Sequence, residues 1–409
     1  MLTVETLSEL SFDRRKAILG RSTDDLAPVM EKTRDILSAL RSDPRGALFE
    51  EYGKFKDNLT LEDFKVSSEE LQKARRSLAP EILAALTKAK ENIESFHRSQ
   101  LERPMYLTQV SPGLLAGRVS RPISKVGVYI PGGRAAYPSS ALMNVIPAKV
   151  AGVKTIVAMT PPGPGLLARD VILAALDLAG ATQIFKMGGA WAVGSLAYGL
   201  AGVPKVDKIV GPGSSWVTAA KMAVYGEVDI DQPAGPSEGF IIADQTADPE
   251  FLAWDFISQL EHDPQASAVL VSTDRLLAQD VLDLVIKYLP NLERSEIVSQ
   301  ALSNAAILFA PNLAQAFDFA NEYAPEHLQI AVDDPISYLD AVHNAGSIFL
   351  GHHSPIPAGD YATGPNHVLP TGGSARAFSG LSTDSFIKKM TFQKVTPEAL
   401  ENLSETVIT

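Results

Sequence analysis

The sequence contains no cysteine among its 409 residues. A chain without cysteine forms no disulfides, binds no metal through thiolates and has no cysteine nucleophile. Any metal ion bound by this chain must therefore be held by nitrogen and oxygen ligands.

Clusters of positive charge and long apolar runs are also missing. Lysine and arginine total 36 against 48 acidic residues, which gives a net charge of −12, and there is no basic block. Nucleic acids and anionic membranes would require such a block. No stretch reaches the roughly 18 apolar residues of a membrane span, and the N-terminal residues lack the basic and apolar regions of a secretory signal. We therefore expect a cytoplasmic protein with a small-molecule partner, and neither nucleic acid nor membrane as a partner.

The residue pattern predicts a helical N-terminal region followed by two α/β domains. A chain of 409 residues exceeds the size at which one hydrophobic core usually stops growing. Helical periodicity is present around residues 26–40 and again at 80–101, where a proline opens the pattern. From residue 125, short β-rich runs alternate with helical patterns, as βαβ units on a parallel sheet require.

These β-rich runs form two series. The first contains the predicted strands KVGVYI, KTIVAM, TQIFKM and DKIVG, with helices at 139–151 and 166–178. The second contains EGFIIAD, SAVLVS, AAILFA, HLQIAV and GSIFLG, with helices at 251–260 and 274–288. A stretch rich in glycine, proline, serine and threonine follows at 354–383, and a loop of that length is usually functional or disordered.

Glycines follow three strands of the first series. They lie in Pro131-Gly132-Gly133, Gly188-Gly189 and Gly211-Pro212-Gly213. Glycine lets backbone N–H groups approach a phosphate closely where a helix begins. None of the three is a complete G-x-G-x-x-G motif, and each alone is more typical of a tight turn. Their succession at strand ends favours a crevice that binds a ligand.

Two polar pairs are candidates for metal binding or catalysis. Gln259 and His262 lie three residues apart near a predicted helix end and could hold one ion from a shared face, although such a pair is usually just a polar face. Glu326 and His327 are adjacent at a junction between loop and strand. This suits an acid/base pair, although on these residues alone a capping glutamate beside a structural histidine is the favoured interpretation.

The polar stretch at 354–383 contributes two more candidates. Asp360 and His367 place a carboxylate and an imidazole in it. Together they could complete a metal site or a substrate site.

In their order and spacing, six strings of the sequence resemble the histidinol dehydrogenase family. They are VGVYIPGGRAAYPSS, VDKIVGPG, VDIDQPAGPSE, SQLEHD, YAPEHL and AGDYATGPNHVLPT. The resemblance extends over the whole chain. It implies two incomplete Rossmann-like parallel-sheet domains, NAD as oxidant, a bound zinc ion, and a homodimer in which each active site borrows residues from the partner's C-terminal tail.

We expect the chain to divide accordingly. Residues 1–23 would form an N-terminal arm, and residues 24–129 together with 239–380 the first α/β domain, which carries the zinc and acid/base residues. Residues 130–238 would form the second α/β domain, on the NAD side, and residues 381–409 a short C-terminal segment.

The resemblance also implies a role for each matching residue. The catalytic acid/base residues would be Glu326 and His327. The zinc ligands would be Gln259, His262 and Asp360. The substrate contacts would be Ser237, Gln259, His262, His327, Asp360 and His367. The cofactor contacts would be Tyr129, Gly132, Gly133, Gly189, Trp191, Gly213 and Ser214.

The sequence departs from the family pattern in two places. Trp191 and Ser214 stand where the family usually has glutamine and asparagine, and the tryptophan could stack on a ring of the cofactor or simply fill the groove. In the family the chain also continues beyond the equivalent of Thr409, and the neighbouring subunit supplies from there a substrate-binding glutamate and a fourth zinc ligand, a histidine. Either such a tail lies outside this sequence, or zinc has three protein ligands. The last residues resemble the opening of a helix without a stop signal, which favours the first reading.

The implied reaction is the NAD-dependent oxidation of L-histidinol to L-histidine through the aldehyde, in histidine biosynthesis. Zinc would position the substrate, although a site of nitrogen and oxygen ligands would also accept cobalt or manganese. His327 would take the alcohol proton. Glu326 would activate water, because no cysteine is present to form a thiohemiacetal. The alternatives are a divergent paralogue that oxidises another polar alcohol, such as sulfopropanediol, and a non-catalytic binding homologue.

Overall fold

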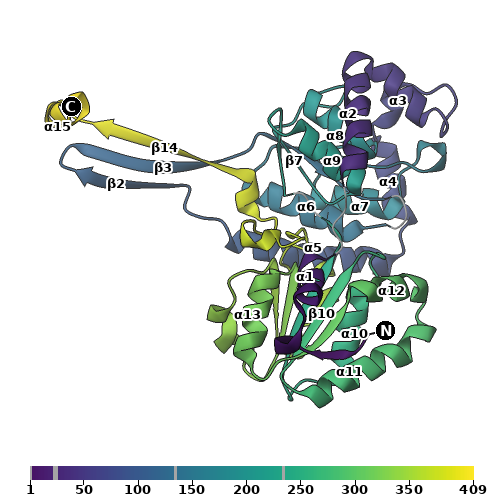
Figure 1. Ribbon diagram of the computed structural model, residues 1–409. Helices are drawn as coiled ribbons and strands as arrows, with labels where there is room; N and C mark the ends of the chain where they lie inside the picture. The colour runs from purple at the N-terminus through teal and green to yellow at the C-terminus, as the bar shows by residue number, and fades with distance from the viewer. Residues whose placement is uncertain (1, 22–25, 133–135, 233–234) are drawn as a thin grey trace.

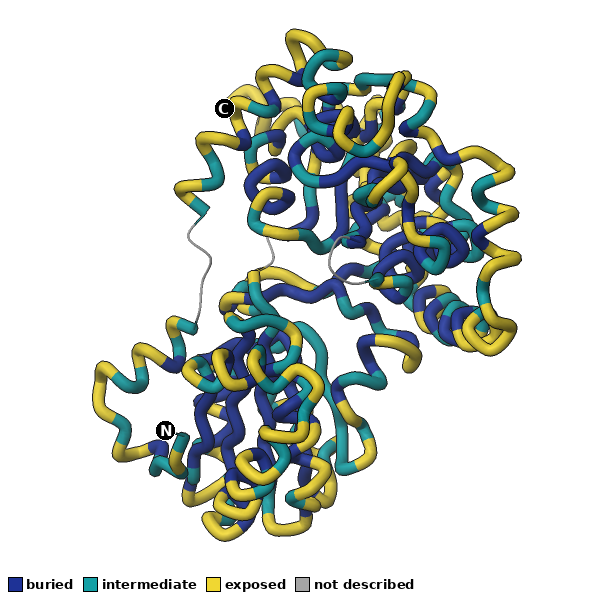
Figure 2. The backbone as a smooth tube through the Cα atoms, turned by 90° about the vertical axis from the view of Figure 1, so that its right-hand side faces the viewer, coloured by how far each residue is buried: buried dark blue, intermediate teal, exposed yellow. Residues whose placement is uncertain are grey.

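Two α/β lobes and a protruding strand arm make up the computed structural model (Figure 1), which describes residues 2–21, 26–132, 136–232 and 235–409. The buried residues lie in the interior of each lobe (Figure 2). Helix α5 (Pro80–Ser99) runs between the lobes. None of the described helices is both long and apolar enough to cross a membrane.

The lower lobe in Figure 1 contains a six-stranded parallel sheet in the order β1-β11-β10-β9-β12-β13. Its strands are β1 (Val4–Thr6), β9 (Glu238–Ala243), β10 (Ser267–Ser272), β11 (Ala306–Phe309), β12 (His327–Ala331) and β13 (Ser347–Leu350). Every residue of β9, β10 and β12 is buried, which accounts for the uninterrupted apolar runs of the sequence.

Helices cover both faces of this sheet. One core lies under α10 (Pro249–Leu260), α11 (Arg275–Tyr288) and α12 (Ser295–Ala301). The other lies under α1 (Phe12–Gly20) and α13 (Leu313–Tyr323). Strands β9, β10 and β11 are neighbours in sequence order, and β12 then lies on the other side of β9.

The upper lobe contains a five-stranded parallel sheet in the order β6-β5-β4-β7-β8. Its strands are β4 (Lys125–Tyr129), β5 (Thr155–Thr160), β6 (Gln183–Lys186), β7 (Lys208–Val210) and β8 (Asp229–Ile230). The order of strand addition reverses here as well, because the chain adds β5 and β6 on one side of β4 and then places β7 on the other side. The predicted fold of two Rossmann-like parallel sheets is therefore confirmed.

Helices also cover both faces of the upper sheet. On one face lie α4 (Ser68–Ser77), α5, α6 (Pro138–Ala151) and α7 (Asp170–Ala179). On the other lie α2 (Ala27–Ser42), α3 (Pro44–Tyr52), α8 (Gly189–Tyr198) and α9 (Ser215–Val224).

The sequence analysis did not predict the arm. It is an antiparallel sheet in the order β14-β3-β2, followed by helix α15 (Pro397–Ile408), and it extends far from both lobes (Figure 1). Its strands are β2 (Met105–Ser111), β3 (Leu114–Pro122) and β14 (Ile387–Val395). All of β2 is exposed, so these strands lack the alternation of buried and exposed residues that marks a strand on a core.

The division of the chain differs from the prediction. Helices α2 to α5 pack on the sheet of the upper lobe, and β4 is one of its strands. Strands β2 and β3 lie in the arm. Residues 26–129 therefore do not form a single domain with residues 239–380. The predicted N-terminal arm adds β1 to the lower sheet beside β11. The apolar stripe of a helix shows that one face is buried, but not which sheet buries it. The stretch 354–383 is ordered and contains helix α14 (Ile356–Tyr361).

Candidate active site

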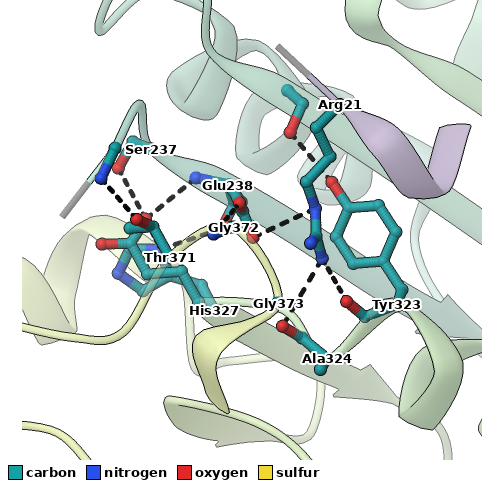
Figure 3. Close-up of polar contacts among 12 residues, drawn as sticks. Arg21, Ser237, Glu238, Tyr323, Ala324, His327, Thr371, Gly372 and Gly373 are labelled. Carbon is teal, nitrogen blue, oxygen red and sulfur yellow. Dashed lines mark hydrogen bonds and ion pairs between the residues drawn. The ribbon is translucent and has the colours of Figure 1, made fainter. Parts of the chain in front are cut away.

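The predicted acid/base residues lie where β9 and β12 begin. These strands are neighbours and parallel, with His327 paired to Gly239, so their amino ends meet at one edge of the sheet. Ser237 donates its hydroxyl to Glu326 at 2.9 Å, and the N–H of Glu238 donates to the same carboxylate oxygen at 2.9 Å. Nδ1 of His327 contacts the C=O of Glu238 at 3.1 Å. Figure 3 shows Ser237, Glu238 and His327 close together.

The protonation of these side chains depends on burial and on mutual charge. Burial raises the pKa of Glu326, although the charge of His327 opposes the rise. Burial lowers the pKa of His327, but the carboxylates of Glu326 and Asp360 outweigh it and raise that pKa to about 9. Because Nδ1 donates to a carbonyl, Nε2 is the nitrogen that faces the site, 3.4 Å from an oxygen of Asp360.

Asp360 and His367 reach this edge from the polar stretch. Asp360 lies on α14, and its C=O is 2.7 Å from Nδ1 of His367. Nε2 of His367 is 3.3 Å from the hydroxyl of Ser140 on α6, in the upper lobe. A cavity of about 270 Å³ is lined by His327, Asp360 and His367, among other residues. The site therefore lies where the two lobes face each other.

Gln259 and His262 complete the set of predicted metal ligands. The side chain of Gln259 is fully buried, and neither of its amide atoms has a hydrogen-bond partner among the described residues. Nδ1 of His262 contacts the C=O of Ser258 at 2.9 Å, which leaves Nε2 to bind a ligand. The charge of His262 also acts on the pKa values of Asp360 and His367, so it lies near both.

The donor set fits a metal ion in its chemistry. Within the described residues, no three His, Asp or Glu side chains form a ready-made metal site, and the predicted set differs because one of its ligands is an amide. An unpaired amide in a dry interior costs free energy. A cation bound by this amide, an imidazole and a carboxylate would remove that cost.

A second carboxylate lies beneath the site. Asp255 is one helical turn before Gln259 on α10, and it accepts from the amide of Gln329 at 2.7 Å and from the N–H of Ile356 at the start of α14. Burial raises the pKa of Asp255 to about 6. The group supports α14, which carries Asp360.

The predicted cofactor residues lie on the other sheet, at the carboxyl ends of its strands. Tyr129 ends β4, Gly189 follows β6, and Gly213 follows β7. The reversal between β4 and β7 makes this edge the usual ligand crevice of an open parallel sheet. Gly132, after β4, has no room for a Cβ, which would lie 2.9 Å from the hydroxyl of Thr160. Gly133 lies outside the described residues.

The loop after β7 is held by a buried ion pair that the sequence analysis did not single out. Gly211 has φ of +116°, and a Cβ there would lie 2.2 Å from the C=O of Tyr129, so only glycine fits. Its N–H donates to Asp231 at 2.7 Å, and its C=O accepts from Lys221 at 3.0 Å. Lys221 and Asp231 are ion-paired and buried. Ser214, exposed, precedes α9 as its N-cap residue.

Tyr52 is a further residue that sequence reasoning missed. Its hydroxyl accepts from the N–H of Gly188 at 2.8 Å and lies 3.2 Å from the C=O of the same residue. The hydroxyl of Tyr129 accepts from the N–H of Gly189 at 3.3 Å. Trp191 packs edge-on against Tyr52, with 6.3 Å between ring centroids. The only signal for Tyr52 in the sequence is an aromatic residue at the end of a helical pattern.

Comparisons with known proteins give the family. A family model described as histidinol dehydrogenase matches residues 19–409. A histidinol dehydrogenase from Methanothermobacter thermautotrophicus is 49% identical over 403 residues, which cover 98% of this chain and 94% of the relative. One from Methanosarcina barkeri is 46% identical and covers 100% of this chain and 94% of the relative. The chain belongs to the histidinol dehydrogenase family.

The solved structures agree with this membership. The crystal structure of histidinol dehydrogenase from Elizabethkingia anophelis superposes with a TM-score of 0.94 at 39% identity, over 100% of this chain and 93% of that chain. The resemblance drawn from the sequence is confirmed, and the chain is a member of an oxidoreductase family of histidine biosynthesis. In this histidinol dehydrogenase family member, the predicted zinc, substrate and acid/base residues gather on the lower lobe, and the predicted cofactor residues that the structure describes gather on the upper lobe.

Proposed function

We propose that this chain oxidises L-histidinol to L-histidine through the aldehyde, with NAD as oxidant and zinc as resident metal. The observation that carries the proposal is a buried acid/base pair, Glu326 and His327, beside the amide of Gln259, which has no hydrogen-bond partner among the described residues. This group faces a second parallel sheet whose crevice bears the glycine loops. Such an arrangement allows one polar alcohol to contact the pair while a dinucleotide reaches it from the other lobe.

Gln259, His262 and Asp360 are the residues that would hold zinc. When bound, zinc supplies a Lewis acid that holds the imidazole and amine of the substrate and orients its carbinol. The buried position of Gln259 and Asp360 excludes water from this side of the substrate. His367, 3.3 Å from Ser140, lies at the boundary between the lobes, where a bound substrate would meet it.

His327 is proposed as the group that takes the alcohol proton. Its Nδ1 donates to the C=O of Glu238, which fixes the ring orientation, and in the neutral form of the imidazole Nε2 is the nitrogen that accepts a proton from the substrate. NAD, when bound, would supply the acceptor for the hydride that leaves the same carbon. The first oxidation thus removes one proton and one hydride and leaves the aldehyde.

Glu326 is proposed as the base for the second oxidation. The aldehyde must gain water before a second hydride can leave, and a chain without cysteine cannot use a thiohemiacetal instead. Burial raises the pKa of Glu326, which makes its carboxylate a stronger proton acceptor. Hydrogen bonds from Ser237 and from the Glu238 N–H to one carboxylate oxygen leave the other oxygen to face water.

We also propose that two copies of the chain associate through the arm. The strand register places Met105, Leu107, Val119, Met390 and Phe392 on one face of the β14-β3-β2 sheet. Four of these residues are exposed, between 36% and 57%: Met105, Leu107, Met390 and Phe392. An apolar sheet face without a core beneath it is typical of a protein interface, and a second copy of the same face would cover it with twofold symmetry.

A second candidate is a paralogous activity on another polar alcohol. Trp191 favours it, because its ring packs against Tyr52 beside the Gly188-Gly189 loop and alters the surface offered to a cofactor. A panel of alcohols that includes L-histidinol and sulfopropanediol, followed by NADH formation, separates the two candidates. Tight zinc binding without any heat of NAD binding in calorimetry would instead favour a non-catalytic homologue.

The deciding experiment measures NADH released per L-histidinol consumed, with zinc present. A ratio of about two is expected for two successive hydride transfers. No NADH from L-histidinol, together with turnover of another alcohol, would overturn the proposal in favour of the paralogue.

A further inference from the structure

Glu238, the first residue of β9, holds both proposed acid/base residues through its main chain. Its N–H donates to Glu326 at 2.9 Å, and its C=O accepts from Nδ1 of His327 at 3.1 Å. A tilt of this single peptide segment would move both side chains together. Reactivity falls steeply when reacting groups are displaced by as little as about 1 Å.

The side chain of Glu238 forms a buried ion pair (Figure 3). One carboxylate oxygen lies 3.3 Å from Nε of Arg21, and the other accepts from the N–H of Gly372 at 2.5 Å. The side chains of both charged partners are only 4% exposed. A buried carboxylate is costly unless it is paired. Burial raises the pKa of Glu238 to about 7, and the charge of Arg21 opposes this rise. Arg21 is therefore the charged group, beside the N–H of Gly372, that positions this carboxylate.

Arg21 also holds the segment that leads into Glu326. It follows α1 directly, and its guanidinium donates to the C=O of Tyr323 and, at 3.4 Å, to that of Ala324. The guanidinium carbon lies 3.5 Å from the centroid of the Tyr323 ring. Glu326 comes two residues after Ala324. A planar guanidinium can serve the carboxylate, the carbonyls and the ring at once, in fixed directions, and a lysine ammonium cannot.

We propose that Arg21, from the N-terminal segment, is a positioning residue for this oxidation. It ties the start of β9 to the segment that enters β12, and in this way it fixes Glu326 relative to His327. The inference rests on the roles proposed above for those two residues.

The test compares Arg21→Met with a matched control, Arg14→Met. Arg14 lies on α1 in the same segment and forms a partly exposed ion pair with Glu5 at 2.8 Å, away from the acid/base residues. Arg21→Met should lower kcat about 100-fold while the KM for NAD stays unchanged, because the predicted cofactor loops lie on the other sheet. Arg14→Met should leave kcat within about twofold of wild type.

Two further variants separate positioning from general loss of structure. Arg21→Lys keeps the charge and should restore part of kcat, which protects the test if Arg21→Met folds poorly. The double variant of Arg21→Met with Glu326→Gln should be no slower than Glu326→Gln alone, because groups that act through one another are not additive. Equal losses in Arg21→Met and Arg14→Met, or full additivity in the double variant, would overturn the inference.

A readout without turnover distinguishes this inference from the proposed function. In protein labelled with ¹⁵N-histidine, the His327 signal, assigned with His327→Asn, should report a protonated Nδ1 that is hydrogen-bonded to a carbonyl. That signal should change in Arg21→Met and not in Arg14→Met. If wild type does not oxidise L-histidinol but the signal still changes, the proposed substrate is wrong and the positioning stands. An unchanged signal together with an unchanged kcat would refute the positioning.

Discussion

The substitution Gly239→Ala tests the metal site without replacing a proposed ligand. Gly239 is paired with His327 in the sheet, and the side chain of Gln259 crosses it. A Cβ at position 239 would lie 2.4 Å from Cγ of Gln259 and 3.1 Å from its Cδ. Gln259 is fully buried, so it has no empty space into which it can move. Its amide must therefore shift away from the position that a metal ion would require.

The size of the effect follows from the cost of overpacking a core. Such substitutions typically cost about 1–3 kcal/mol. If that cost falls on the amide position, zinc affinity drops about 5- to 150-fold, because about 1.4 kcal/mol corresponds to a factor of ten. The measurement is a competition between metal-free protein and a chromophoric zinc chelator, with thermal unfolding of the metal-free protein recorded in parallel.

Gly163→Ala is the matched control. A Cβ at Gly163 would meet only the C=O of Leu167, at 3.7 Å, which is an ordinary contact. Zinc affinity in this variant should equal that of wild type. A Gly239→Ala protein that binds zinc as tightly as the Gly163→Ala protein would refute the assignment of Gln259 as a ligand.

Other substitutions separate chemistry, stability, the cofactor loop and assembly. Glu326→Gln should slow the oxidation of added aldehyde about 100-fold or more, measured as NADH formation, and equal slowing of the alcohol step would contradict its role as the water-activating base. Lys221→Met leaves the carboxylate at the Gly211 loop buried and unpaired and should lower the free energy of unfolding by about 3–5 kcal/mol, measured with denaturant; an unchanged value would contradict the pairing. The folded-state pKa of Asp255, about 6, lies above its ordinary value of 3.8, so its stabilising contribution is present below pH 4 and lost as pH rises through 6. The free energy of unfolding of Asp255→Asn should therefore rise relative to that of wild type, by about 3 kcal/mol between pH 4 and pH 8. A difference between the two proteins that stays constant over this pH range would argue against the raised pKa. Met390→Asp, on the apolar face of the arm, should dissociate the dimer in sedimentation experiments, whereas Thr391→Asp on the opposite face should not; identical behaviour of the two variants would count against this interface.

The strands of the two lobes could be predicted because parallel strands buried on both faces leave uninterrupted apolar runs. The predicted run SAVLVS coincides with β10 at Ser267–Ser272, and HLQIAV differs from β12 by one residue. The arm could not be predicted in this way. Its strands pack on none of the described cores, so burial imposes no alternation on β2, and its pairing with β3 makes it a strand.

Candidate site residues could be found only where polar residues or glycines stand at the beginning or the end of these apolar runs. Glu326 and His327 stand at the start of a strand, and the glycines stand at strand ends. Arg21 and Tyr52 carry no such signal, because their partners lie far away in the sequence. Glu238 was missed for another reason. Its main chain, rather than its side chain, holds Glu326 and His327.

The sequence by itself determined the α/β class, the two series of strands, the resemblance to the family, and the exclusion of thiolate chemistry by the absence of cysteine. Each of these depends on residue type and on local periodicity, which any stretch of chain carries within itself. The tertiary structure decided that helices α2 to α5 belong to the upper lobe, that Arg21 pairs with Glu238, and that the amide of Gln259 has no hydrogen-bond partner among the described residues. These facts depend on which distant surfaces pack together, and a local pattern specifies only that a surface is buried, not what buries it.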